Sequence, residues 1–296
     1  MRTRRDDDLK RRLDRLYETY GSGYLHTDPV CFPRRYARPD DREVAGFLAA
    51  VFAYGRVPQI QASVDRLLGL MGDSPAAFVR GFDPRHGRRL LRGFVHRFND
   101  ARDTGLLLHF MRQMMERSGS LEGFFLEGDA AGSDDVGSAL SSFARRALSL
   151  DCSPYYRTGR LPDDAGVRFF LPSPEDGSSC KRLNLFLRWM VRPDDGVDMG
   201  VWRGVSPARL VIPLDTHVSR IASYIGLTTR RTVGWPMAMD VTRRLRRLDP
   251  DDPVKYDFAL CRLGILDACP RARDAVKCAG CGLRSLCCLG PETDMT

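Results

Sequence analysis

Cysteines gather near the end of the chain, in the stretch "CPRARDAVKCAGCGLRSLCC" that runs from residue 269 to residue 288. Cys269, Cys278, Cys281 and Cys287 follow the spacing C-x8-C-x2-C-x5-C. Four thiolates from one short loop can hold a single metal centre, either a tetrahedral ion or the four irons of a cubane. Zinc sites usually combine two close cysteine pairs, whereas this loop has one close pair and two single cysteines. The spacing therefore favours a [4Fe–4S] cluster over zinc, with Cys288 competing with Cys287 as the fourth ligand.

The chain begins with the charged residues "MRTRRDDDLK" and has no apolar run of the roughly 18 residues that a membrane span needs. We therefore expect a cytoplasmic protein with no membrane partner, in which disulfides are disfavoured. The scattered thiols of Cys31, Cys152, Cys180 and Cys261 are interpreted as buried or incidental.

The chain is basic, with a formal net charge of +8. This balance favours an anionic partner such as nucleic acid, although it does not locate the contact surface. Nearly all of the basic residues are arginines, and the lysines are Lys10, Lys181, Lys255 and Lys277. Chemistry that needs a lysine amine therefore has few candidates.

The hydrophobic pattern predicts helices almost throughout. Apolar residues recur at i, i+3, i+4 and i+7 within 44–51, 183–190 and 218–225, which is the spacing of one buried helical face. Further helical runs cover 104–119, 138–150, 236–248 and 254–266, and Pro236 suits the first turn of its helix. No convincing run of alternating strand residues is found. The expected fold class is therefore all-α, with turns or insertions rich in Gly, Pro, Asp and Ser between the helices.

The cysteine loop resembles the iron–sulfur loop of endonuclease III and adenine-glycosylase enzymes, which belong to the helix-hairpin-helix superfamily of DNA glycosylases. In that family the first spacing is shorter than here, while the x2 and x5 spacings agree. Three upstream segments extend the resemblance. "EVAGFLAAVFAYGRVPQIQASVDRLL" (43–68) is similar to a helix-turn-helix that lines the lesion pocket, "IPLDTHVSRIASYIGL" (212–227) to the segment in which a catalytic aspartate opens a helix, and "DPVKYDFALCRLGILDAC" (252–269) to the helix that leads into the cluster. Within the superfamily the chain most closely resembles a little-characterised bacterial family that is called a domain of unknown function.

The hairpin that names the superfamily is matched only in part, by "EDGSSCKRLNLFL" (175–187). The glycosylases carry a hydrophobic-Pro-Gly-x-Gly turn, which a lysine follows in the lyase-type members. Gly177 matches the first glycine, Ser179 stands in place of the second, and Lys181 falls on the lysine. After this lysine, the segment "RPDDGVDMGVWRGVSP" (192–207) lengthens the interval to the aspartate, so we expect it to reshape or cover the pocket.

The resemblance implies a two-lobed helix-hairpin-helix fold with a C-terminal [4Fe–4S] loop. The central lobe would cover about 45–210, and 1–44 would join 211–296 in a terminal lobe that carries the iron–sulfur loop. It implies a monomer that repairs double-stranded DNA carrying a damaged base, in the cytoplasm and associated with the nucleoid. Two alternatives stay open: a non-catalytic iron–sulfur protein that keeps the fold in order to recognise DNA, and a zinc-stabilised nucleic-acid protein.

The resemblance places the catalytic roles on Asp215 and Lys181. Cleavage of an N-glycosidic bond develops positive charge on the deoxyribose, and a nearby carboxylate such as Asp215 stabilises it. A neutral lysine amine such as Lys181 would attack C1′ and form a Schiff base, from which β-elimination cuts the strand. Asp215 is equally suited to a plain helix N-cap, Lys181 to a solvated helix position. Lys255 is a weaker second amine, expected to be exposed at a helix start.

Base flipping needs side chains that fill the duplex and read the extruded base. By position, Tyr54 would stack, and Arg56 and Gln59 would donate hydrogen bonds; as alternatives, Tyr54 is a core residue and Arg56 a surface charge. Backbone N–H groups near Gly177, together with Arg182, would contact phosphate.

Overall fold

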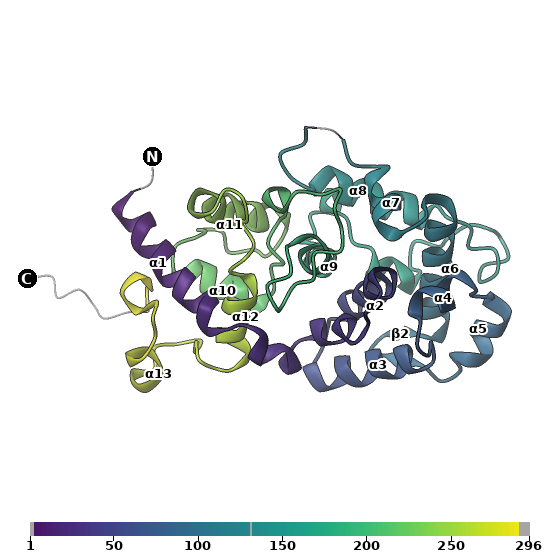
Figure 1. Cartoon of the computed structure of the whole chain (residues 1–296), viewed down its shortest axis with the longest axis horizontal. Helices are drawn as coiled ribbons and strands as arrows, with labels where there is room; N and C mark the ends of the chain where they lie inside the picture. The colour runs from purple at the N-terminus through teal and green to yellow at the C-terminus, as the bar shows by residue number, and fades with distance from the viewer. Residues whose placement is uncertain (1–2, 131, 290–296) are drawn as a thin grey trace, which may run out of the picture.

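The computed structural model describes residues 3–130 and 132–289 and consists of helices joined by turns (Figure 1). It is 58% helical and 1% strand, which confirms the all-α class. The strand content is one antiparallel ladder, in which Val95 pairs with Asp100 and His96 with Asn99.

The elements follow one another along the chain, with longer connections between α8 and η4 and between α9 and η6. The α-helices are α1 (Arg4–Thr19), α2 (Pro39–Val51), α3 (Val57–Gly69), α4 (Pro75–Arg80), α5 (Pro84–Leu90), α6 (Ala101–Ser118), α7 (Leu121–Leu126), α8 (Gly137–Leu148), α9 (Lys181–Val191), α10 (Thr216–Tyr224), α11 (Trp235–Leu248), α12 (Asp257–Ile265) and α13 (Ala275–Ala279). The strands are β1 (Val95–His96) and β2 (Asn99–Asp100). The 3₁₀ helices are η1 (Ser22–Thr27), η2 (Pro29–Cys31), η3 (Pro33–Arg35), η4 (Gly166–Phe170), η5 (Pro174–Asp176), η6 (Pro207–Arg209) and η7 (Arg284–Leu286).

The helices predicted from apolar periodicity are confirmed in α2, α6, α8, α9, α10, α11 and α12. Pro236 occupies the first turn of α11, where its missing N–H costs no helical hydrogen bond. Side-chain caps fix other helix starts; Asp100, for example, caps α6 in a capping box with Asp103. The segments 43–51 and 57–68 form the expected helix-turn-helix as α2 and α3.

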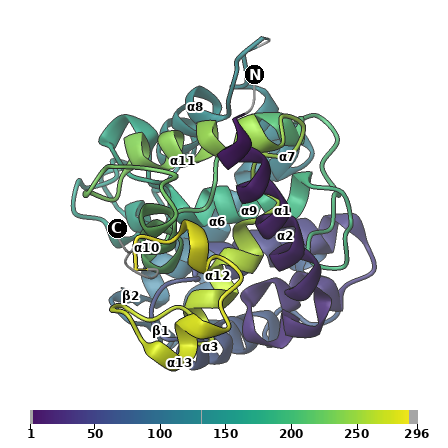
Figure 2. The same cartoon turned by 90° about the vertical axis from the view of Figure 1, so that its left-hand side faces the viewer.

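The helices gather into two groups that share a central pair. In Figure 1, α3 to α8 lie on one side, α1 and α10 to α13 lie on the other, and α2 and α9 lie between them. Figure 2 turns the second group toward the viewer, where α1 runs alongside α12. Gly46 allows the close approach of the central pair, because a Cβ there would lie 2.7 Å from Cε of Met190. The core is therefore continuous from one group to the other.

The segment 192–207 packs into the molecule instead of extending from it. Asp198 is fully buried and accepts hydrogen bonds from Arg188 and Arg192, which both belong to α9 or its end. Trp202 donates its indole N–H to Oε1 of Glu43 on α2, at 2.8 Å. These contacts tie the segment to both central helices.

No helix within the described residues is long and apolar enough to cross a membrane.

Candidate active site

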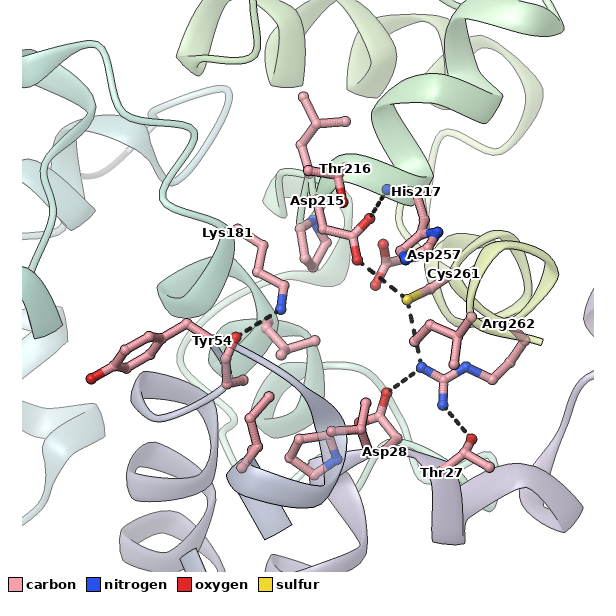
Figure 3. Close-up of a pocket in the computed structure, with 18 of the residues that line it drawn as sticks. Thr27, Asp28, Tyr54, Lys181, Asp215, Thr216, His217, Asp257, Cys261 and Arg262 are labelled. Carbon is pink, nitrogen blue, oxygen red and sulfur yellow. Dashed lines mark hydrogen bonds and ion pairs between the residues drawn. The ribbon is translucent and has the colours of Figure 1, made fainter. Parts of the chain in front are cut away.

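A pocket of about 420 Å³ lies where the two groups of helices meet. Its walls come from the α2–α3 turn, the η1–η2 junction, one face each of α9 and α12, and the start of α10 (Figure 3). Lys181 and Asp215 both line it, although they belong to different helices. Among the described residues that line the pocket, none comes from 192–207, so this segment does not cover the pocket, and the alternative that it reshapes the pocket stays a prediction.

Asp215 is the N-cap of α10. Its Oδ1 accepts the backbone N–H groups of His217 at 2.8 Å and Val218 at 2.7 Å, which satisfies two donors that the helix leaves free. Its Oδ2 accepts a hydrogen bond from the thiol of Cys261 on α12, at 3.5 Å. The cap therefore holds the carboxylate at the pocket wall while one oxygen stays on the pocket side (Figure 3).

Lys181 is the first residue of α9 and is half-buried. The preceding residue, Cys180, adopts a left-handed conformation with φ of 48°, which turns the chain sharply into the helix. The ammonium group donates to the carbonyl of Ala53 in the α2–α3 turn, at 3.2 Å. Figure 3 shows the amine and the Asp215 carboxylate pointing into the same space.

A second carboxylate, Asp257, forms part of the pocket wall. It is only 2% exposed and receives a hydrogen bond from Arg188, but its Oδ1 has no partner among the described residues. Burial raises the pKa of Asp257 from 3.8 to about 7, against the opposing effect of Arg188 and with a further increase from Asp215. A group with this pKa exchanges a proton near neutral pH.

The remaining polar wall combines Cys261 with a buried ion pair. Arg262 donates to Oδ2 of Asp28 at 2.9 Å and to Sγ of Cys261 at 3.5 Å. Burial raises the pKa of the Cys261 thiol, and Asp215 raises it further, so the thiol stays protonated and donates. Cys261 is therefore part of the pocket and not an incidental thiol. Asp28 and Arg262 lie 234 positions apart in the chain, and nothing local in the sequence pairs them.

Several buried polar atoms of this pocket are left without partners. They are Oδ1 of Asp257, Nη2 of Arg188, Nε of Arg262 and Nδ1 of His217, considered within the described residues. Buried polar atoms in folded proteins are usually hydrogen-bonded, so these four make the region beneath the pocket surface unusually polar.

The residues proposed to read a flipped base lie only partly at the pocket. Tyr54 lines it, but its hydroxyl points away and donates to Oδ1 of Asn99 at 2.6 Å. Arg56 and Gln59 are exposed at the start of α3, outside the pocket lining of the described chain. The structure therefore joins Tyr54 to Lys181 and Asp215, and leaves the other two at the surface.

The hairpin region departs from the expectation at Arg182. The element before the turn is the three-residue 3₁₀ helix η5. Gly177 keeps the left-handed conformation of a turn, with φ of 74°. The prediction that Arg182 contacts phosphate is wrong, because its side chain is buried and donates to the carbonyls of Val51 and Phe169. Burial lowers the pKa of Arg182 to about 10. Its side chain packs inside the molecule and does not reach a phosphate.

The C-terminal loop brings its predicted metal ligands together. Cys269, Cys278, Cys281 and Cys287 line one small cavity, whereas Cys288 is exposed and outside that lining. The thiols lie around this common space, but no group of three or more His, Cys, Asp or Glu side chains in 3–130 and 132–289 is arranged to hold a single metal ion. The donor set of four soft thiols fits an iron–sulfur cluster.

Comparisons with known proteins place the chain at the level of a family. No curated protein and no solved structure matches it significantly. A family model described as "Protein of unknown function (DUF2400)" matches residues 28–266, a span that includes every described residue of the pocket lining except Thr27. Because the match covers most of the chain, the protein belongs to the DUF2400 family.

Proposed function

We propose that this protein is a DNA N-glycosylase with AP-lyase activity, which removes a damaged base from double-stranded DNA. One observation carries the proposal: a single pocket joins the Lys181 amine, at the start of α9, to the Asp215 carboxylate, at the start of α10. Attack at C1′ requires an amine, and stabilisation of the positive charge at C1′ requires a carboxylate.

Asp215 would act on the sugar. As the glycosidic bond breaks, its electron pair leaves with the base, which takes up a proton, and positive charge develops at C1′. The carboxylate would stabilise that charge most strongly in a pocket from which the DNA has displaced water. Because Oδ1 is committed to the helix cap, Oδ2 is the oxygen available for this role.

Lys181 would be the nucleophile. Its contact with the Ala53 carbonyl must be exchanged for the sugar, and the amine must lose a proton before it forms the C–N bond. Ring opening then gives a Schiff base, and β-elimination releases the 3′ phosphate. The neighbouring Asp257, which titrates near neutral pH, is suited to accept or return a proton in this sequence.

The basic net charge and the turn before α9 support DNA as the substrate. The net charge is +8, which favours the phosphate backbone. The first turn of α9 has no side-chain cap, so its N–H groups remain suitable for a phosphate oxygen. Gly177, exposed in the preceding turn, lets a strand approach without steric conflict.

We further propose that Cys269, Cys278, Cys281 and Cys287 hold a [4Fe–4S] cluster. Their shared cavity supports one metal centre in this loop, and the spacing of one close pair and two single cysteines favours the cluster over zinc. A cluster there would stabilise the loop and hold its arginines near the DNA, away from the reacting sugar.

The first test is borohydride trapping on duplexes that carry an abasic site or an oxidised base. We expect a covalent adduct with the wild-type protein and none with Lys181→Ala. Lys255→Ala is the matched control, because Lys255 lies outside the pocket lining of the described chain. It is half-buried, not exposed as expected, and pairs with Asp14 at 3.3 Å and Asp249 at 2.6 Å. An adduct that survives Lys181→Ala would rule out Lys181 as the nucleophile.

Asp215 is tested by separating its two roles. Serine is as good an N-cap as aspartate, so Asp215→Ser should keep the stability of α10, whereas Asp215→Ala should lower the free energy of unfolding by about 1 kcal/mol. Both variants should slow base release by about 100-fold or more, since both lack the carboxylate. Base release by Asp215→Ser at the wild-type rate would rule out a catalytic carboxylate at this position.

A non-catalytic DNA-binding protein is the second candidate function. The serine at position 179, where the hairpin pattern has its second glycine, and the engagement of the Lys181 amine with Ala53 favour it. It predicts tight binding to damaged duplexes with neither base release nor trapping across a panel of damaged bases.

A further inference from the structure

Three aromatic rings cluster at the edge of the pocket. They are Tyr54, Phe98 and Phe169, which we call the aromatic platform. The ring centroids of Phe98 and Phe169 lie 4.5 Å apart. The ring centroid of Tyr54 lies 5.4 Å from that of Phe98 and 4.8 Å from that of Phe169. Phe98 is 59% exposed and Phe169 is 38% exposed, whereas most large apolar side chains of this protein are buried. An exposed aromatic cluster of this kind marks a binding surface.

Phe98 is held outward by a rigid hairpin. It forms the two-residue turn between β1 and β2 together with Arg97, whose φ of 56° is unusual for a residue with a side chain. The flanking residues anchor the turn. His96 is buried, and its ring nitrogens lie 2.8 Å from Oγ of Ser63 and 3.0 Å from the carbonyl oxygen of Tyr54. The exposure of Phe98 is therefore built into the fold.

Arginines surround the platform. The guanidinium of Arg182 lies beneath it, 3.9 Å from the ring centroid of Phe169 and 5.1 Å from that of Tyr54. Arg97 is exposed and covers Gly55, where a Cβ would lie 2.9 Å from Cδ of the arginine. Arg56 follows Gly55 in the chain and is exposed. The combination of open aromatic faces and positive charge complements a ligand that is both aromatic and anionic.

The platform is continuous with the pocket. Tyr54 belongs to both, and Gly55 lines the pocket beneath the side chain of Arg97. A ligand on the platform would therefore lie beside whatever occupies the pocket.

We propose that the aromatic platform binds an unpaired nucleobase of a DNA strand by stacking on Phe98, whose ring lies at 82° to that of Phe169. Such a base becomes available when its partner leaves the duplex, and aromatic side chains next to arginines stack on bases irrespective of sequence. The proposal rests on the proposed function only in taking DNA as the ligand. It would also relocate base stacking from Tyr54, whose hydroxyl is held by Asn99, to the exposed ring of Phe98.

The test measures binding without chemistry. The full-length protein is titrated into a duplex that carries a non-cleavable abasic analogue opposite 2-aminopurine, a fluorescent base that reports stacking. We expect the protein to change the 2-aminopurine fluorescence, and Phe98→Ala to abolish that change and weaken binding about tenfold. Phe98→Trp should restore both. Val95→Ala is the matched control, since Val95 is 59% exposed in the same hairpin but is not aromatic, and it should bind as the wild type does.

Two results would overturn the proposal. One is unchanged affinity and fluorescence in Phe98→Ala. The other is altered self-association of Phe98→Ala, measured by sedimentation, with unchanged DNA binding, because it would make the platform a protein interface. If Phe98→Ala leaves DNA binding unchanged, borohydride trapping at Lys181 is still expected. If Lys181→Ala abolishes trapping, the 2-aminopurine signal is still expected, so each experiment tests its own proposal.

Discussion

At the scale of single residues, Asp257 has the most unusual environment. It is enclosed at the pocket wall, pairs with Arg188, and keeps one carboxylate oxygen without a partner among the described residues. Burial disfavours the charged form of Asp257. The guanidinium of Arg188 favours that form, but Arg188 is shared with Asp198 and offsets only part of the burial effect. The residue is therefore balanced between its two protonation states at neutral pH.

This balance predicts a pH dependence of stability. The pKa of Asp257 in the folded protein is about 7, above its ordinary 3.8, so its contribution to stability is present below about pH 4 and is lost as the pH rises through about 7. Asp257→Asn cannot ionise. The free energy of unfolding of the wild type minus that of Asp257→Asn should therefore fall between about pH 5 and pH 8, as measured by urea denaturation at each pH.

Asp83→Asn provides the comparison. Asp83 is a fully exposed N-cap whose pKa is lowered by hydrogen bonds from the backbone of Arg85 and His86, so the same difference should be flat over this range. A flat difference for Asp257 as well would mean that it is ionised throughout, contrary to the expectation.

The site residues divide by how far apart in sequence their partners lie. Lys181 and Asp215 could be predicted, because each falls in a motif: a turn followed by a helix, and a cap followed by a helix. Asp257 and Cys261 could not be predicted, since their character comes from burial and from partners on α9 and α10. Arg182 was misplaced because arginine at a helix start is normally solvated, whereas here it lies over two aromatic rings.

At the scale of elements, the segment 192–207 acts as an internal brace. Arg188 and Arg192 project from α9 toward the same buried carboxylate, Asp198, and Trp202 reaches Glu43 on α2. The carboxylate is fully buried between two guanidinium groups, an arrangement in which removal of one member leaves uncompensated charge.

We therefore expect Asp198→Ala to lower the free energy of unfolding by about 3–5 kcal/mol. The neighbouring Asp194 pairs with Arg34 at the surface, at 2.6 Å with its side chain 52% exposed, so Asp194→Ala should cost about 1 kcal/mol or less. Chemical denaturation of both variants measures the difference. Equal effects of the two substitutions would show that the segment is not a brace.

Long amphipathic elements were predictable and short ones were not. The buried faces of α2, α9 and α10 repeat at helical spacing over two turns, which is enough to define a period. Elements such as α4 and α7 are six residues long, and η2, η3 and η5 are three, which is too short for any period. The first helix, α1, buries only Asp6, Leu9 and Leu13. Its sequence is mostly charged, so too few apolar residues repeat to predict a helix there.

At the scale of the whole molecule, the C-terminal loop is tied back to helices from both ends of the chain. Arg12 on α1 donates to the carbonyl of Gly282 at 2.7 Å. On α10, Arg220 donates to the carbonyl of Cys269 at 2.7 Å, and the carbonyl of Tyr224 accepts the N–H of Cys288 at 2.9 Å. A cofactor in this loop would therefore stabilise the half of the molecule that also carries Asp215.

These contacts predict which cysteine is the fourth ligand. Cys287 lines the cavity with the other three thiols, while Cys288 is held by its backbone with an exposed side chain. Purified without oxygen, the wild type should be brown and contain iron and sulfide, Cys287→Ser should lose both and melt at a lower temperature, and Cys288→Ser should match the wild type. The reverse pattern in the two variants would assign the ligand to Cys288. Zinc without iron in a colourless wild type would contradict the cluster, since four thiolates in one loop bind either centre and only the bound metal distinguishes them.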